Sequence, residues 1–390
     1  MDLLAQIKLM QQQPRQERPR TETPPAECWK KTVLRPLEEF PGAFELPQRA
    51  VRLMEASELP PAVDPTRILY LDTETTGLSG GAGTLVFQIG LGRLTPEGFR
   101  IDQRMIRDYP EERALLEATA EALADCDVIC TFNGRTFDLP LLRSRMILQR
   151  LPVADLDKPH IDLLHIARRV FKLRLQQCNL GRLEEKLLGI RREDDLPGSE
   201  VPERFFTYLR TGRFELLEDV LRHNEQDIAS LCVLLNHMAS LYHQPEQLTF
   251  GEDLLSMGNG LERYQHPEEA RYCWSLVPQG PAHAQSRLQL AASYRRSGDR
   301  EAAVKIWQDL ARHHEGGIEP WVELAKYYEH TARDLPRALS CTRHALAQLA
   351  EPSLFPRETV QFERNALQYR YARLQRKLSG SREEQQETGR

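Results

Sequence analysis

Four acidic residues carry the strongest chemical signal in this sequence: Asp72, Glu74, Asp138 and Asp227. Asp72 and Glu74 follow the apolar run ILYL, and alternation along a strand places residues i and i+2 on one face. Asp138 follows a second apolar run, VICTF, after a short loop. Asp227 lies beside the apolar stripe of a helix expected over 214–242. Burying four like charges together is prohibitive unless cations neutralise them, so the set predicts two bound divalent ions, Mg²⁺ or Mn²⁺.

Two ions about 4 Å apart are the recurring arrangement for cleaving phosphodiesters. His223 precedes Asp227 by four residues, one helical turn, and a neutral imidazole can take a proton from a metal-bound water. Each residue also has an ordinary structural interpretation. The His223 and Asp227 side chains could form a simple i,i+4 surface pair, and Asp138 could cap the helix that follows it. Asp162, at the start of another helix, is expected to be a cap.

Three runs, DTETTG, NGRTFD and HNEQD, resemble the exonuclease motifs of the DEDD superfamily, which has a ribonuclease-H-like fold. From DTETTGLSGGAGT through RREDDLPGSEVP to HNEQDIASL the chain is similar to the YprB-like domain of bacteria. The resemblance implies a divalent-metal-dependent 3′–5′ exonuclease. It assigns the four carboxylates to the metal site and His223 to the general base. The superfamily's histidine branch has a five-residue spacing before the last aspartate, whereas this chain has the four-residue spacing of the tyrosine branch.

Further residues are expected to contact the substrate. The loop TTGLSGGAGT holds glycines that would let the backbone approach a nucleotide, although a flexible connection between strands is the alternative. The basic run ARRVFKLR could neutralise phosphates or could simply be a solvated helix face. The predicted substrate-binding residues are Thr75, Gly77, Asn133, Phe137, Arg168 and Arg169.

The pattern of apolar runs predicts two folded domains. Strands expected near 67–72, 86–94, 99–106 and 127–133, followed by helices, indicate an α/β ribonuclease-H-like mixed sheet flanked by helices over 67–244. Beyond it, Arg287 and Tyr294 match Trp321 and Tyr328 at a spacing of 34 residues, which predicts an all-α domain of tetratricopeptide (TPR) repeats over 245–376. Residues 1–66 are expected to be a disordered N-terminus with an extended arm, and 377–390 a polar tail.

Composition narrows the class of protein. The chain has 390 residues, 41% of them hydrophobic, and a net charge of −5. No apolar run approaches the ~18 residues of a membrane span, and the N-terminus lacks a secretory signal pattern. The seven cysteines are scattered with no CxxC pair, which is typical of a reducing cytoplasm rather than a disulfide framework.

The sequence therefore predicts a cytoplasmic nuclease that binds DNA or RNA, with a protein partner at the TPR module and no membrane. Two alternatives remain open at this stage. One is a TPR scaffold whose nuclease-like domain is not catalytic, which the four mutually repelling carboxylates argue against. The other is a structure-selective endonuclease with the same metal chemistry.

Overall fold

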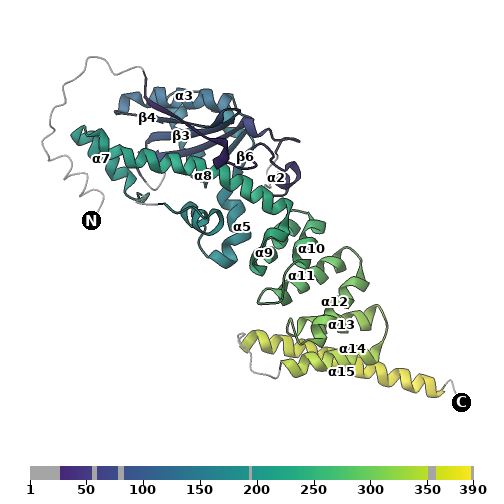
Figure 1. Ribbon diagram of the computed structural model, residues 1–390. Coiled ribbons are helices and arrows are strands. Elements are labelled where there is room, and N and C mark those ends of the chain that lie inside the picture. Colours follow the sequence, from purple (N-terminus) through teal and green to yellow (C-terminus); the bar gives the residue numbers. More distant parts are fainter. Residues whose placement is uncertain (1–26, 55–58, 78–82, 193–195, 350–356, 388–390) are drawn as a thin grey trace. The chain divides into compact units, whose positions relative to one another are not determined.

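The computed structural model describes residues 27–54, 59–77, 83–192, 196–349 and 357–387 (Figure 1). The chain divides into two compact units, Met1–Gln244 and Pro245–Arg390. The first unit is an α/β structure and the second consists of helices. Within the described residues, no helix is long and apolar enough to cross a membrane.

The first unit is built on a mixed sheet that has six strands in the described part of the chain. The strand order across the sheet is β1-β4-β3-β2-β5-β6. The pairs β1–β4, β4–β3 and β3–β2 are antiparallel, and the pairs β2–β5 and β5–β6 are parallel. The strands are β1 (Trp29–Arg35), β2 (Ile68–Thr75), β3 (Val86–Thr95), β4 (Gly98–Met105), β5 (Val128–Thr131) and β6 (His160–Asp162).

Helices flank this sheet, and α8 runs along it next to β2, β3 and β4 (Figure 1). The helices are α2 (Gln48–Met54), α3 (Glu112–Ala124), α4 (Asp138–Leu148), α5 (Leu163–Leu175), α6 (Leu180–Leu183), α7 (Val201–Thr211) and α8 (Glu218–His243). A π-helical turn, η5 (Glu184–Leu188), continues α6. Short 3₁₀ turns are η1 (Leu37–Glu39), η2 (Pro65–Arg67), η3 (Tyr109–Glu111), η4 (Ala154–Asp157) and η6 (Phe214–Leu217).

The main core of this unit joins the sheet to α3, α4 and α7. Phe87 of β3 stacks on Phe205 of α7 with ring centroids 4.2 Å apart. Leu115 of α3 and Leu142 of α4 are fully buried in the same cluster. These helices bury the faces that their apolar spacing predicts, and the buried area anchors the strand ends at which the acidic residues lie.

Two parts of the first unit differ from the sequence expectations. The arm expected on the surface contributes β1, which pairs along its whole length with β4, and α2, which packs against α8. β1 reads WKKTVLR and lies at the edge of the sheet, where charged side chains such as its two lysines and its arginine are typical. The helix expected from residue 161 is preceded by the short strand β6, because three residues are too few to show a period of two.

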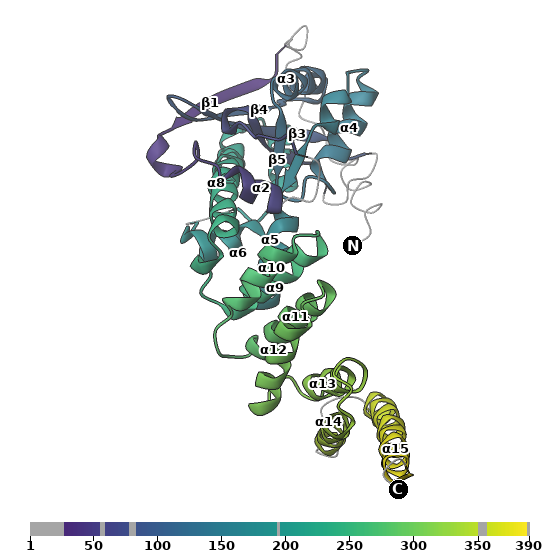
Figure 2. The ribbon, with the colours of Figure 1, turned by 90° about the vertical axis from the view of Figure 1, so that its right-hand side faces the viewer.

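The second unit contains η7 (Pro245–Gln247) and successive helices that pack on their neighbours in the chain (Figure 2). They are α9 (Gly251–Arg263), α10 (Pro267–Ser275), α11 (His283–Arg296), α12 (Arg300–Arg312), α13 (Glu319–His330), α14 (Leu335–Gln348) and α15 (Arg357–Glu387). Helix pairs in series agree with a helical repeat region, and the TPR assignment itself stays a prediction. Contrary to the polar tail expected from residue 377, α15 continues to Glu387, and 388–390 lie outside the described residues.

Candidate functional site

The end of β2 carries the first two predicted metal ligands. The buried first half of β2 ends just before Asp72. Asp72 pairs with Gly90 and Glu74 with Gln88 on the neighbouring strand β3. The Asp72 Oδ2 atom accepts a hydrogen bond of 2.9 Å from the side chain of Asn224 in α8. Since alternate strand residues share a face, Asp72 and Glu74 both lie on the α8 side of the sheet.

Two glycines in β3 allow α8 to come close to this strand end. A Cβ atom at Gly90 would lie 2.3 Å from Asn224 Oδ1, and one at Gly92 would lie 2.5 Å from Ile228 Cγ2. A larger residue at either position would displace the α8 side chain that lies over it. Asp227 lies between these two contacts along α8, so the close packing of helix on sheet brings its carboxylate to the β2 carboxylates.

Asp138 approaches β2 from the opposite face of the sheet. It occupies the first turn of α4 and is 7% exposed. Its Oδ1 atom accepts a hydrogen bond from the hydroxyl of Thr73, the residue between Asp72 and Glu74. The residue that caps α4 is Phe137, and it makes no side-chain capping bond. Asp138 is therefore held to the sheet rather than used as a helix cap.

An arginine and a histidine surround Asp227. Arg192, on the segment after η5, donates 2.5 Å bonds to Asp227 Oδ1 and to Glu184 Oε2. The His223 Nε2 atom lies 3.5 Å from Asp227 Oδ2, and its Nδ1 atom lies 3.4 Å from Arg192 Nη1. Glu184 is fully buried and also accepts a hydrogen bond from Ser230. Asp227 is thus already partly neutralised by the protein.

The pKa of Asp72 reflects the convergence of the predicted ligands. Burial raises the pKa of this carboxyl well above its ordinary value, and three neighbouring carboxylates raise it further: Asp227, Glu74 and Asp138. The hydrogen bond from Asn224 acts in the opposite direction. Because charge–charge effects weaken with distance, the four acidic side chains share one electrostatic environment.

The other two buried carboxylates respond to the same environment. Burial raises the pKa of Asp138 to about 6, against the hydrogen bond from Thr73. Burial also raises the pKa of Asp227, although the charges of His223 and Arg192 lower it. Protonation or a bound cation would relieve both groups.

The donor types at this site fit a divalent ion. Carboxylate oxygens from Asp72, Glu74, Asp138 and Asp227 are the hard ligands that Mg²⁺ and Mn²⁺ prefer. Among the residues that the structure describes, however, no group of three or more His, Cys, Asp or Glu side chains is arranged closely enough to hold an ion. The four carboxylates therefore interact electrostatically without forming a finished coordination shell.

Hydrogen bonds to Asp162 hold the backbone of the NGRTFD loop. The Asp162 carboxylate, fully buried, accepts bonds from the backbone N–H groups of Asn133 at 2.8 Å and Arg135 at 3.1 Å. It also accepts from Leu164 N at 3.1 Å, which confirms the expected cap of α5. Asn133 has φ +68°, a left-handed conformation that asparagine tolerates. The loop that leads into Asp138 is therefore rigidly held.

The remaining predicted substrate residues have differing surroundings. The Thr75 hydroxyl donates to the carbonyl of Gly77 at 2.9 Å and shapes the start of the glycine loop, of which 78–82 lie outside the described residues. Phe137 is 48% exposed although it adjoins the buried Asp138. Arg168 is exposed on α5, whereas Arg169 donates to the carbonyl of Met54 and so ties α5 to α2.

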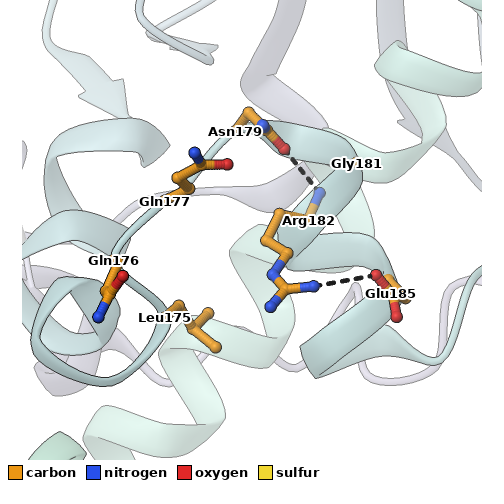
Figure 3. Close-up of a pocket in the computed structure, with 7 residues that line it drawn as sticks. All are labelled: Leu175, Gln176, Gln177, Asn179, Gly181, Arg182 and Glu185. Carbon is orange, nitrogen blue, oxygen red and sulfur yellow. Dashed lines mark hydrogen bonds and ion pairs between the residues drawn. The ribbon is translucent and has the colours of Figure 1, made fainter.

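A pocket of about 450 Å³ lies at the end of α5 and the start of α6 (Figure 3). Asn179 caps α6 there by accepting from Arg182 N, and the Arg182 side chain pairs with Glu185. None of the predicted site residues lines this pocket. We assign no chemistry to this pocket.

Three residues that bond to the carboxylates were not predicted from the sequence: Thr73, Arg192 and Asn224. Glu184, which was not predicted either, bonds to Arg192. Thr73 and Asn224 lie inside the recognised motifs, and their positions next to acidic residues were an available signal. Arg192 lies in the run RREDDLPGSEVP, but nothing in that run pairs it with Asp227 or Glu184, contacts that only the folded chain makes.

A sequence profile of the RNase_H superfamily matches residues 69–239, which span β2 to α8. The first unit therefore contains a ribonuclease-H-superfamily domain, as expected. The chain is also 32% identical over 322 residues to the uncharacterized protein YprB of Bacillus subtilis, covering 80% of this chain and 75% of YprB. The chain belongs to the YprB family.

Among solved structures, the chain resembles the family B DNA polymerase of Pyrobaculum calidifontis. The TM-score is 0.37 with 14% sequence identity, and the match covers 62% of this chain and 30% of the polymerase. A likeness of this size carries no argument about function.

Proposed function

We propose that the first unit is a divalent-metal-dependent nuclease that hydrolyses phosphodiester bonds of nucleic acid as a 3′–5′ exonuclease. The observation that carries this proposal is that three other carboxylates, Glu74, Asp138 and Asp227, lie near enough to Asp72 to raise its pKa. Bound Mg²⁺ or Mn²⁺ would supply charge stabilisation at the phosphate and a more acidic water. The cleavage direction rests on the resemblance to the DEDD exonucleases.

In this proposal Asp72, Glu74 and Asp227 hold the cations, and Asp138 completes the second site. Thr73 lies between Asp72 and Glu74 in β2, and its hydroxyl donates a hydrogen bond that orients Asp138. The cations would draw these side chains closer than they lie here. Their attraction must also compete with Arg192 for Asp227, since both bind the same carboxylate.

His223 is proposed to accept the proton of the attacking water. Its two ring nitrogens face Asp227 and Arg192. A nitrogen can accept that proton only when its contact opens, because a general base must reach the water directly. The 3.4 Å contact of His223 with Arg192 can open while Arg192 keeps its two bonds to the buried Glu184, at 2.5 and 2.7 Å.

The exposed ring of Phe137 supports a role in substrate binding. An aromatic ring that stays half exposed beside a buried ligand can stack on a nucleobase, a contact worth about 1–3 kcal/mol per base. Thr75, Gly77 and Asn133 would border the scissile nucleotide, and the exposed Arg168 would contact a phosphate. We assign Arg169 no phosphate contact, because it bonds to Met54.

The decisive experiment is digestion of end-labelled single- and double-stranded DNA and RNA, with and without Mn²⁺. The full chain should release nucleotides stepwise from the 3′ end of at least one substrate, only with the cation. The Asp72→Asn variant should release none above background. Cleavage of circular substrates would instead indicate an endonuclease. Equal digestion by the wild-type chain and by Asp72→Asn would show that Asp72 is not part of the catalytic site.

A second candidate function is favoured by the Arg192–Asp227 ion pair. A protein that supplies its own cation to one carboxylate needs less metal there, as expected of a binding domain that has no hydrolytic activity. The helix pairs of the second unit would then act as a protein-binding module. Nucleic-acid binding without hydrolysis, unchanged by Mn²⁺ or by Asp72→Asn, would support this candidate.

A further inference from the structure

Gln103, Gly90 and Asp72 lie side by side on the neighbouring strands β4, β3 and β2. Gln103 of β4 pairs with Gly90 of β3, and Gly90 pairs with Asp72 of β2. Gln103 is fully buried, and its Nε2 atom donates to the carbonyl of Leu221 at 2.7 Å and to Asn224 Oδ1 at 3.2 Å. Asn224 is fully buried above Gly90 and donates to Asp72.

This chain of hydrogen bonds fixes the orientation of the Asn224 amide. Gln103 presents an N–H donor, so the oxygen of Asn224 must face it and the NH₂ group must face Asp72. If the amide were reversed, its NH₂ group would face the Gln103 donor and its oxygen would face the carboxylate of Asp72. A side chain at Gly90 would displace Asn224, because even a Cβ atom would lie 2.3 Å from its oxygen.

We propose that Gln103 and Asn224 are positioning residues for Asp72 in cation binding. The proposal deepens the metal-dependent activity proposed above and rests on it. Asn224 holds Oδ2 of Asp72 and thereby sets the plane in which the carboxylate meets a cation, while Gln103 holds Asn224. Partners of this kind orient metal ligands, and their loss typically weakens metal binding by about 10–100-fold.

The chemistry of the donor distinguishes this role from charge neutralisation. Asn224 is neutral, so it orients Asp72 and leaves its negative charge available to a metal ion. Arg192 carries a positive charge and competes with a cation at Asp227. A purely structural partner for a buried carboxylate would be expected to neutralise it, since an unpaired buried charge is costly.

The test measures Mn²⁺ binding to the full chain by isothermal titration calorimetry, without any substrate. Asn224→Ala should weaken the Asp72-dependent binding by about tenfold, and Gln103→Met should weaken it by about threefold because it acts through Asn224. The matched control is Asn236→Ala. Asn236 lies on the same helix and donates to Cys232, and its loss should leave Mn²⁺ affinity unchanged.

A double-mutant comparison separates positioning from general damage. In the Asp72→Asn background, adding Asn224→Ala should cause no further loss of Mn²⁺ affinity, because there is no longer a carboxylate to orient. Circular dichroism of each variant checks the fold. If Asn224→Ala does not fold, the Gln103→Met variant, which touches no ligand, decides the question.

The outcomes distinguish the two proposals. Wild-type protein that binds no Mn²⁺ in an Asp72-dependent manner overturns both the metal-dependent activity and the positioning role. Wild-type binding that Asn224→Ala and Gln103→Met leave intact overturns the positioning role alone. Equal losses in the wild-type and Asp72→Asn backgrounds would also overturn it, by showing that the effect does not pass through Asp72.

Discussion

Two carboxylates, one in each unit, have opposite electrostatic surroundings in this protein. Glu329 in α13 is fully buried and bonds to Arg370 at 2.9 Å, Arg373 at 2.7 Å and Lys377 at 3.0 Å, all from α15. Burial alone would raise its pKa, but these cations outweigh that effect and lower the pKa. Asp72 in β2 instead has a neutral amide partner and three acidic neighbours, and its pKa is raised.

The difference supports the proposed site at Asp72 and a structural role for Glu329. Glu329 fastens α15 to α13 and has its counter-charges built in. Asp72 lies in a cluster of like charges that destabilises the metal-free fold, and such clusters are retained where a cation or substrate repays them. Asp227, paired with Arg192 and close to the acidic cluster, lies between these two cases.

The largest expected effect comes from removing the charge of Asp72. Asp72→Asn should lower Mn²⁺-dependent hydrolysis by about a thousandfold or more, since metal ions supply several kcal/mol to such reactions. The same variant should raise the thermal midpoint in EDTA, because it removes a repelled buried charge. Rates are measured by nucleotide release and stability by calorimetry. A lower midpoint in EDTA would place Asp72 with Glu329 as a structural carboxylate.

The pH dependence of metal-free stability tests Asp138, the buried carboxylate that is proposed to complete the second cation site. Asp138 has a pKa of about 6 in the folded protein and an ordinary value of 3.8. The folded state therefore binds the extra proton between these values, and stability should fall as pH rises from about 4 to about 6. The loss attributable to Asp138 is about 3 kcal/mol at most.

Asp138→Asn should remove that part of the pH dependence and make the protein more stable than wild type at pH 7 in EDTA. Chemical denaturation of both proteins at a series of pH values measures this difference. Parallel wild-type and variant curves would show that Asp138 titrates at its ordinary pKa, contrary to the burial and charge seen here.

Substitutions at His223 test whether this residue is the general base of the proposed reaction. His223→Ala should lower kcat by about a hundredfold with little change in KM, the size expected for a lost general base. His223→Tyr should retain more activity than alanine, since the four-residue spacing is that of the tyrosine branch. If alanine and tyrosine are equally active, another group accepts the proton.

The smallest effect is expected at Glu329. Glu329→Gln should lower stability by about 2 kcal/mol, because it leaves three partly exposed cations around a neutral group. Mn²⁺ affinity and hydrolysis should not change. Thermal unfolding and Mn²⁺ titration of the full chain measure both. An effect on Mn²⁺ affinity would break the contrast between the two carboxylates.

The amino-acid sequence alone predicted most of the local elements, and it singled out the four acidic residues as a proposed site. The apolar run before Asp72 predicted β2, and the stripe around Asp227 predicted α8, because both patterns repeat within one element. Asp162 as a helix cap followed from its place before an apolar helix. Sequence patterns of this kind are local, so they identify an element and the face that it buries.

Only the tertiary structure decided how those elements meet. The approach of α8 to Gly90, the bond from Asn224 to Asp72 and the ion pair of Arg192 with Asp227 join residues that are distant in the chain. The joining of β1 to the sheet is equally non-local. These contacts depend on steric fit and on the pairing of buried charges, which leave no periodic trace in the sequence.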